Sequence, residues 1–519
     1  MMMIIEKLIG TTLAARMADK DDGSESKDND EIQVADSESG YHSAVGMVFV
    51  FNLIVGTGAL ALPGTFQDAG WLLSLILVSC IALSSYITVT YIQECMSYSN
   101  AILAHQRRPS VLNSSQNSSH NSDVTEQSYL LSSSAASEND FEIRECVELG
   151  KMVHLFFNKV GVVIFYICIV VYLYGDLAIY SAAVPKSLRD VICVYKPADA
   201  NCSMGWNDTW LTDDTQCFPG VTTISRMSAY RLCVALFAVC LGPFIFFNLK
   251  KTMVLQIITS MMRWFSFGTM IVLAIYQLST NEQKPQPKIA DFAQVPNLFG
   301  VCVYSFMCHH SLPSMITPIR DKKRVSLLLR VDYLLILGFY ILLSLTAVFA
   351  FTHIPDLYTL TFEPSKCQNP DNPAPAFFQY FLALFPVFTL STSFPIIGIT
   401  LRNNLQTLFL TDGKIYPFLI RRVLFPLLVL LPPVAVALAT NQVDILVGIT
   451  GSYAGSAIQY FIPVALVYCG RKEVQKRFGS VNNYSHTSPF KHVAWLIGLI
   501  IWAVACVVFV TVKHVTTGQ

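Results

Sequence analysis

Long apolar stretches alternate with short polar segments along most of this 519-residue chain. A helix needs about 20 consecutive apolar residues to cross the hydrocarbon core of a bilayer. Stretches of that length predict eleven membrane-spanning helices, so we expect an all-α polytopic membrane protein. The predicted spans are 44–65, 70–93, 158–182, 229–248, 253–278, 293–318, 333–352, 376–401, 423–442, 445–468 and 493–512.

The segments between the spans differ in charge and composition. Lys and Arg gather in alternate loops, which the positive-inside rule places in the cytosol together with the N-terminus. Acidic and Ser/Asn-rich stretches contain too few apolar residues to build a core and are expected to be disordered. The predicted organisation is a disordered cytosolic tail at 1–43, a membrane core at 44–468 with a disordered cytosolic loop at 98–145 and a lumenal or extracellular loop at 185–228, a basic cytosolic loop at 469–492, a last span at 493–513 and a short lumenal C-terminus at 514–519.

Composition supports the membrane assignment and excludes several function classes. Only 13% of the residues are charged, against about 25% in soluble proteins. The formal net charge is +0, so no basic excess points to a nucleic-acid partner. The sequence contains no P-loop, HExxH, GxSxG or paired CxxC motif, and we therefore expect no enzymatic activity and no cofactor.

The lumenal loop has features of an oxidising compartment. It carries N-glycosylation sequons at Asn201 and Asn207, and its clustered cysteines suit the same side of the membrane. We expect a disulfide between Cys202 and Cys217. Two further cysteines compete for this pairing, Cys193 and Cys367.

A candidate sorting signal lies in the first cytosolic loop. Glu126, Leu130 and Leu131 fit the acidic dileucine pattern that clathrin adaptors recognise in the cytosol. An exposed Leu–Leu pair on a flexible segment can fill an apolar groove of such a partner, although Ser/Leu-rich linkers also produce the pattern by chance. If the signal works, we expect the protein in endosomal or lysosomal membranes; the plasma membrane is the alternative.

The first predicted span contains a break. Its segment NLIVGTGALALPG, residues 52–64, holds three glycines and a proline, and in a helix interior glycine costs roughly 1 kcal/mol and proline roughly 3 kcal/mol. In lipid, a broken helix is tolerated where it lines a protein-walled cavity. Free amides at such a break attract a carboxylate, and free carbonyls attract a cation. Close packing of small residues against a neighbouring helix is the alternative explanation.

The sixth predicted span is interrupted as well. Its segment VYSFMCHHSLPSMITPI, residues 303–319, contains the adjacent His309 and His310 together with Pro313 and Pro318. Broken spans at corresponding places in two halves indicate a transporter site between inverted repeats. A five-plus-five repeat places them at spans one and six, as here. The histidines could cap the break, contact substrate or carry protons.

Asp176 is the one acidic residue well inside a predicted span. Tyr172 and Tyr180 lie four residues on either side of it and share its helix face. A buried carboxylate needs a partner or a proton. Arg263 in the fifth span is the expected counterion, with tyrosine hydroxyls as the alternative. Asp176 and Arg263 are then either a proton or gating site or a structural ion pair.

Several motifs resemble those of the amino acid/auxin permease superfamily. FNLIVGTGALALPGTFQDAGW is similar to the first helix of its members, and FMCHHSLPSM to the sixth helix of the sodium-coupled neutral amino acid transporters. With YLYGDLAIY, LFPVF, FPII, TLRNN and VGITGSYAG, they identify nearly the whole chain from about residue 44 as a divergent branch of that superfamily. The resemblance implies a five-plus-five inverted repeat with broken first and sixth helices, followed by an eleventh helix.

The resemblance also implies roles for individual residues. Gly56, Thr57 and Gly58, together with Ser305 and the two histidines, correspond to a substrate site. Asn52 corresponds to a residue that helps to bind Na⁺ in the sodium-coupled relatives. Hydroxyls of the eighth span would complete the ion site, unless they bond to carbonyls of their own helix. These hydroxyls belong to Thr389, Thr392 and Ser393.

The sequence therefore predicts a secondary active transporter of small organic solutes, above all neutral amino acids, that works by alternating access. Asn52 and the hydroxyls favour Na⁺ as the coupling ion, whereas the histidines and Asp176 leave H⁺ open. The competing hypothesis is a sensor of the same fold that signals amino-acid occupancy through its cytosolic segments without transport.

Overall fold

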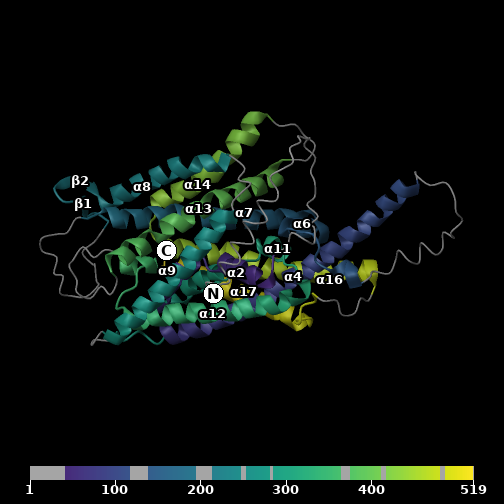
Figure 1. Cartoon of the computed structure of the whole chain (residues 1–519), viewed down its shortest axis with the longest axis horizontal. Coiled ribbons are helices and arrows are strands. Elements are labelled where there is room, and N and C mark those ends of the chain that lie inside the picture. Colours follow the sequence, from purple (N-terminus) through teal and green to yellow (C-terminus); the bar gives the residue numbers. More distant parts are fainter. Residues whose placement is uncertain are drawn as a thin grey trace.

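The computed structural model describes residues 41–116, 138–194, 213–246, 253–280, 285–363, 375–410, 417–479 and 486–517. Most of this part is helical, and the long helices run roughly along one direction (Figure 1). They are α4 (Trp71–Gln116), α7 (Lys159–Ile192), α8 (Arg226–Leu241), α9 (Met253–Thr280), α12 (Val325–Ala350), α13 (Ala376–Phe409), α14 (Phe425–Ala439), α16 (Ile462–Phe478) and α17 (Val493–Thr517).

Shorter elements connect and interrupt these helices. The short α-helices are α2 (Ser43–Ile54), α3 (Thr57–Ala69), α6 (Leu149–Phe156), α10 (Val295–Ser305), α11 (Leu312–Ile316) and α15 (Val443–Thr450). The 3₁₀ turns are η1 (Glu138–Phe141), η2 (Gly242–Phe246), η3 (Phe292–Gln294), η4 (Lys322–Arg324) and η5 (Tyr358–Phe362), and the π-helical turns are η6 (Ile420–Leu424), η7 (Gly451–Gly455) and η8 (Ala457–Phe461). The strands β1 (Gln216–Phe218) and β2 (Val221–Ser225) form an antiparallel hairpin in which Gln216 lies opposite Ser225.

The arrangement of spans agrees with the predicted fold class, an all-α polytopic membrane protein. In the described part of the chain, 9 helices are long and apolar enough to cross a membrane. The helices α2 and α3 form a further candidate span that is bent by 55° at a break. The predicted sixth span corresponds to α10 and α11, which are both too short to cross alone. Both predicted interruptions are therefore present, five spans apart.

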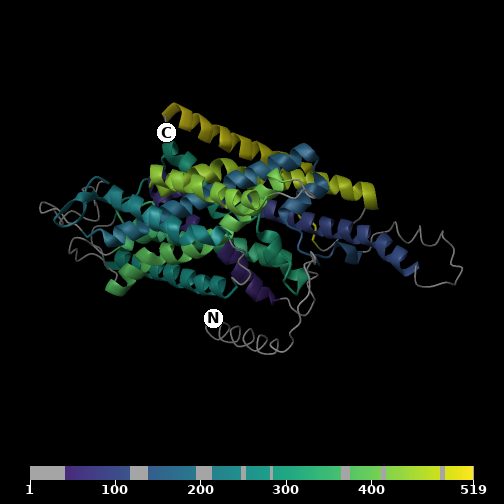
Figure 2. The same ribbon diagram turned by 90° about the horizontal axis from the view of Figure 1, so that it is seen from above.

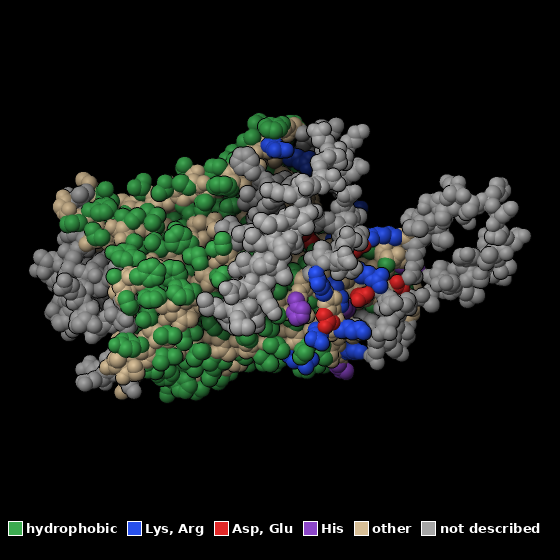
Figure 3. Space-filling model, viewed as in Figure 1, with side chains coloured by type: hydrophobic (Ala, Val, Ile, Leu, Met, Phe, Trp, Pro, Cys, Tyr) green, Lys and Arg blue, Asp and Glu red, His purple; other side chains and the backbone are tan. Residues whose placement is uncertain are grey.

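Charged side chains gather at one end of the molecule. On the face drawn in Figure 3, hydrophobic side chains cover the body of the helices, while Lys, Arg, Asp and Glu cluster near the ends of α4 and α16. By the positive-inside rule we expect this end, the inner end, to be cytosolic and the end that carries the β-hairpin, the outer end, to be lumenal or extracellular, so the sidedness stays a prediction. The last helix, α17, lies along the outside of the bundle (Figure 2).

Local side-chain chemistry sets several helix boundaries. Asn158 caps α7 by accepting a hydrogen bond from the Gly161 N–H at 2.8 Å, and such caps satisfy donors that have no partner within the helix. Between α3 and α4 the chain turns at Gly70, which has a φ of +90°. A Cβ at this glycine would lie 2.6 Å from the backbone nitrogen of Ala290, so the turn has no room for a side chain.

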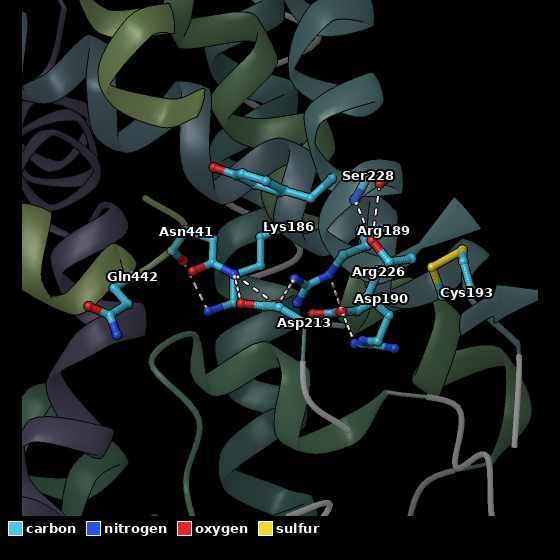
Figure 4. Close-up of polar contacts among 12 residues, drawn as sticks. Lys186, Arg189, Asp190, Cys193, Asp213, Arg226, Ser228, Asn441 and Gln442 are labelled. Carbon is cyan, nitrogen blue, oxygen red and sulfur yellow. Dashed lines mark hydrogen bonds and ion pairs between the residues drawn. A yellow bond between two sulfur atoms is a disulfide. The ribbon is translucent and has the colours of Figure 1, made fainter. Parts of the chain in front are cut away.

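A disulfide closes the outer end of α7 (Figure 4). Cys193, directly after α7, is bonded to Cys217 in β1, with 4.4 Å between the two Cα atoms. The predicted Cys202–Cys217 pairing is therefore wrong, because Cys217 is already bonded to another residue. The β-hairpin leads directly into α8, which packs beside α7, and this topology brings Cys217 to the end of α7. Cys202 lies outside the described residues.

Ion pairs reinforce the same end. Arg189 in α7 and Arg226 in α8 both pair with the buried Asp190 (Figure 4). The Nζ atom of Lys186 lies 2.6 Å from an oxygen of Asp356, which precedes η5. These contacts join α7 to α8 and to the segment before η5, so they fix the outer ends of the helices that surround the two breaks.

The inner end is held by a buried carboxylate. Glu94 is fully buried and accepts hydrogen bonds from the Arg471 guanidinium at 2.8 and 2.9 Å, from the Tyr98 hydroxyl and from the Ser488 N–H. The second span was predicted to end at residue 93, but α4 continues beyond it, so Glu94 lies within a membrane-spanning helix.

The segment 486–492, which leads into α17, is bound to the inner part of α4. The Ser488 hydroxyl lies 2.7 Å from that of Thr90, and the Gln93 amide donates to Nδ1 of His486 at 3.1 Å. Burial lowers the pKa of His486 to about 4, so the ring is neutral at cytosolic pH and Nδ1 can accept this bond. The last span is thus attached to α4 by polar contacts as well as by its apolar face.

We expect Glu94→Gln to destabilise the folded protein. The variant leaves the Arg471 guanidinium without an anion in a partly buried site, and breaking such a pair costs about 3 kcal/mol or more. The thermal unfolding midpoint of the detergent-solubilised protein measures the effect. Glu473→Gln is the matched control, because Glu473 pairs with Arg477 at 2.5 Å on the surface, where a pair contributes about 0–1 kcal/mol. Equal midpoints for the two variants would contradict the prediction.

Candidate functional site

The first break leaves amide groups open at the start of α3. The helix α2 ends at Ile54, α3 begins at Thr57, and Val55 and Gly56 connect them. Among the described residues, the backbone N–H groups of Gly56, Thr57 and Gly58 have no acceptor. Free N–H groups and the positive end of a helix together favour an anion. This end of the break is therefore suited to a carboxylate.

The carbonyl groups on the other side of the same break are already bonded. The Arg263 guanidinium, from α9, donates to the Asn52 carbonyl at 2.7 Å and to the Val55 carbonyl at 3.2 Å. The Tyr340 hydroxyl, from α12, lies 3.2 Å from the Ile54 carbonyl. Protein donors thus occupy the carbonyl oxygens that would otherwise attract a free cation.

The second break lies against the first. The helix α10 ends at Ser305, and its carbonyl accepts from the same Tyr340 hydroxyl at 2.8 Å. A Cβ added to Gly58 would lie 2.4 Å from Oγ and 2.7 Å from Cα of Ser305, so the two backbones are in direct contact. One tyrosine hydroxyl therefore joins the ends of two interrupted helices. Ser305 directs its own hydroxyl to the Val301 carbonyl at 2.7 Å.

The two histidines of the second break face different helices. Nε2 of His309 lies 2.8 Å from the Thr88 hydroxyl of α4, and His309 is fully buried. The His310 ring packs against the Tyr172 ring of α7, with 5.4 Å between centroids. In both residues Nδ1 has no hydrogen-bond partner among the described residues. His310 is thus the histidine that lies beside α7, where Asp176 is located.

Asp176 is surrounded by tyrosines. It is buried and lies close enough to the hydroxyls of Tyr172 and Tyr304 to interact with them, while its Oδ1 atom has no partner within the described residues. Tyr304 is the residue before Ser305, and Tyr180 lies close to both Asp176 and Thr57. The carboxyl group therefore lies near both breaks and has one free oxygen.

The structure does not support the predicted pairing of Asp176 with Arg263. No ion pair joins them in the described part of the chain, because Arg263 is directed to the end of α2. The groups close enough to interact with the Asp176 carboxyl are instead tyrosine hydroxyls, as in the alternative interpretation. The sequence could not decide this, because it does not give the rotation of α9 relative to α7.

The hydroxyls predicted to bind sodium all bond within α13. Thr389 donates to the Phe385 carbonyl at 2.9 Å, and Thr392 and Ser393 donate to the Thr389 carbonyl at 2.8 and 3.2 Å. No hydrogen bond links them to Asn52 among the described residues. The alternative interpretation, bonding back to the helix, describes all three.

Other predicted residues lie outside the described part, and their roles stay predictions. They are the dileucine residues Glu126, Leu130 and Leu131 and the sequons at Asn201 and Asn207.

Two residues of the site were not predicted from the sequence. They are Tyr340 and Tyr304, which connect the breaks to each other and to Asp176. A tyrosine in an apolar span gives little signal by itself, because most buried tyrosines are core residues.

Comparisons with known proteins identify the family. The chain matches the family described as transmembrane amino acid transporter protein over residues 43–110 and 134–511. It is 47% identical over 498 residues to transmembrane protein 104 of Gallus gallus, covering 93% of this chain and 98% of the relative. It is 48% identical over 487 residues to the Homo sapiens protein of that name, covering 91% of this chain and 96% of the relative. It is 45% identical over 495 residues to the Drosophila melanogaster homolog, covering 91% of this chain and 97% of that relative.

Proposed function

Because this chain belongs to the transmembrane amino acid transporter family, we propose that it is a secondary active transporter of small neutral amino acids. The observation that carries the proposal is the pair of breaks in direct contact, with N–H groups at Gly56, Thr57 and Gly58 and an oxygen of the nearby Asp176 that all lack a partner among the described residues. Members of such a family move solutes and do not catalyse reactions.

A zwitterionic amino acid matches the two open groups. Its carboxylate would bind the free N–H groups at the start of α3, where the helix end adds favourable charge. Its ammonium group would bind Oδ1 of Asp176. The rings of Tyr172, Tyr304 and His310 lie around this carboxyl, with 6.2 Å between the centroids of the two tyrosines and 5.4 Å between those of Tyr172 and His310.

We infer that the coupling ion is H⁺ and not Na⁺. Sodium requires several oxygen ligands, but the Arg263 guanidinium already donates to the carbonyls of Asn52 and Val55. The hydroxyls of the eighth span are also used within their own helix. A fixed guanidinium supplies the positive charge that a sodium ion would bring to the end of α2, and it does not leave during transport.

Flux measurements on purified protein in liposomes test the proposal. We expect uptake of labelled neutral amino acids that proceeds equally in sodium and choline buffers and that accumulates when the vesicle interior is more alkaline than the medium. Uptake that requires sodium would refute proton coupling. Binding of amino acids without any flux would refute transport and favour the sensor hypothesis.

We expect Asp176→Asn to lower transport about 10- to 100-fold. A charge-assisted hydrogen bond contributes about 1.5–3 kcal/mol, and about 1.4 kcal/mol corresponds to a factor of ten. The loss would be seen as a raised Km for amino acids, because the carboxyl is expected to bind the ammonium group. Thr392→Val is the control, since Thr392 is a polar residue of the neighbouring α13 that bonds to its own helix. Unchanged transport in Asp176→Asn would contradict the assigned role.

A further inference from the structure

A second buried acid lies near the inner end of the bundle. Asp332 belongs to α12, seven residues beyond its first residue, Val325, which is about 10 Å along a helix. It is fully buried, and neither carboxyl oxygen has a hydrogen-bond partner within the described residues. Sequence analysis missed it because the predicted span begins at residue 333, whereas α12 begins at residue 325.

The linker of the second break lies next to this carboxyl. Cys308, in that linker, is close enough for its thiol to interact electrostatically with Asp332. Its sulfur also lies 3.4 Å from the hydroxyl of Tyr333, the residue that follows Asp332. The Tyr333 hydroxyl is 3.0 Å from that of Ser85 in α4, which in turn lies 3.3 Å from the Phe306 carbonyl. Asp332 is thus joined to the broken span through its immediate neighbours.

Among the described residues, no charged side chain bonds to Asp332. On α12, Arg330 points to the Tyr86 hydroxyl at 3.4 Å, and the linker contributes Cys308 and His309, of which His309 faces Thr88. The α4 side chains that contact these neighbours are the uncharged Ser85 and Thr88. In the described part of the chain, no group of three His, Cys, Asp or Glu side chains could hold a metal ion. A carboxyl in such surroundings is far more stable when it carries a proton than when it is ionised.

We propose that Asp332 carries the proton that is transported with the substrate, an inference that rests on the proposed function. The carboxyl group holds the proton on one oxygen while the site is closed. When the inner ends of the helices separate, water reaches Asp332, the O–H bond breaks and the proton passes to cytosolic water. The resulting carboxylate stays without a proton while the inner side closes, and it takes up its next proton from the outer side together with the next substrate. Asp176 then binds substrate, and Asp332 binds the proton.

The test compares Asp332→Asn with Ser344→Ala in liposomes that enclose a pH-sensitive dye. Ser344 lies on the same helix, is buried and has no partner for its hydroxyl within the described residues, so it matches Asp332 in burial but cannot carry a proton. For Asp332→Asn we expect accumulation driven by a pH gradient to fall to the equilibrium ratio of one and substrate-dependent proton entry to disappear. Exchange of labelled for unlabelled amino acid persists, because it needs no net proton movement. Ser344→Ala retains all three activities.

Accumulation and proton entry at the wild-type level in Asp332→Asn would overturn the proposal.

A second measurement, chemical labelling of Asp332, does not depend on that variant or on transport. A hydrophobic carbodiimide reacts with protonated carboxyls in apolar surroundings, so wild-type protein at pH 7 should form an adduct at Asp332 that mass spectrometry detects. Absence of the adduct at Asp332 would also overturn the proposal. If wild-type protein forms the adduct but moves no amino acid, the proposed function fails while the proton-holding state of Asp332 stands.

Discussion

The Gly58→Ala variant is expected to lose transport almost completely, by about 100-fold or more. The added methyl group would lie 2.4 Å from Oγ and 2.7 Å from Cα of Ser305, and the second distance involves backbone, which cannot rotate away. The two broken helices would have to separate, which breaks the contact of the Tyr340 hydroxyl with one of the two carbonyls. Uptake in liposomes measures the loss, and overpacking of a tight contact typically costs about 1–3 kcal/mol in stability.

The same motif contains its own control. Gly56 lies two residues earlier, and a Cβ at this position meets nothing within 4 Å. Gly56→Ala should therefore keep transport within about twofold of wild type, because the substitution neither clashes nor removes an N–H group. If both alanine variants are inactive, the motif requires flexible backbone in general. If both are active, the close approach of Gly58 to Ser305 plays no part in transport.

The second large effect concerns Arg263. Arg263→Gln removes the positive charge at the end of α2 and leaves the carbonyls of Asn52 and Val55 with a weaker donor. A hydrogen bond from a charged donor contributes about 1.5–3 kcal/mol, so we expect transport to fall by at least about tenfold. Arg263→Lys retains the charge and should keep a larger share of the activity, because an ammonium group can also donate to both carbonyls.

Sodium dependence gives this prediction a second readout. Wild-type protein should transport equally with sodium or choline, since the guanidinium already occupies the carbonyl end of the break. In Arg263→Gln that end is uncharged, and added sodium should restore part of the activity if the arginine acts as a fixed cation. Wild-type activity in Arg263→Gln without sodium would show that Arg263 has no role in transport.

The breaks could be predicted from the sequence because their cause is local. Glycine and proline are unfavourable in a helix interior, and their occurrence in spans one and six is visible without any structure. The close contact of the two breaks was also expected from the repeat. The partners of the exposed carbonyls could not be predicted, because Arg263 and Tyr340 come from distant helices. Their direction depends on how α9 and α12 are rotated in the bundle.

Span boundaries explain the other differences. Hydropathy windows stop near charged residues, so the predicted second and seventh spans excluded Glu94 and Asp332 by one residue each. The helices extend past these acids, which lie inside the protein at 0% exposure. Glu94 has an arginine partner, whereas Asp332 has no partner in the part of the chain that the structure describes. Hydropathy does not give the true ends of the helices. It also does not show whether a buried acid is paired and structural, as Glu94 is, or unpaired and able to carry a proton, as we propose for Asp332.

The Tyr340 hydroxyl affects how easily the ends of α2 and α10 can separate. It has one proton and two acceptors, the carbonyls of Ile54 and Ser305, at 3.2 and 2.8 Å. When either helix end moves away, the Tyr340 O–H group can rotate and donate only to the other carbonyl. The remaining hydrogen bond becomes stronger as the shared one is lost. The shorter distance shows that the Ser305 carbonyl is the stronger of the two acceptors. We therefore expect the contact with the Ile54 carbonyl to be the first to open when the two helix ends separate.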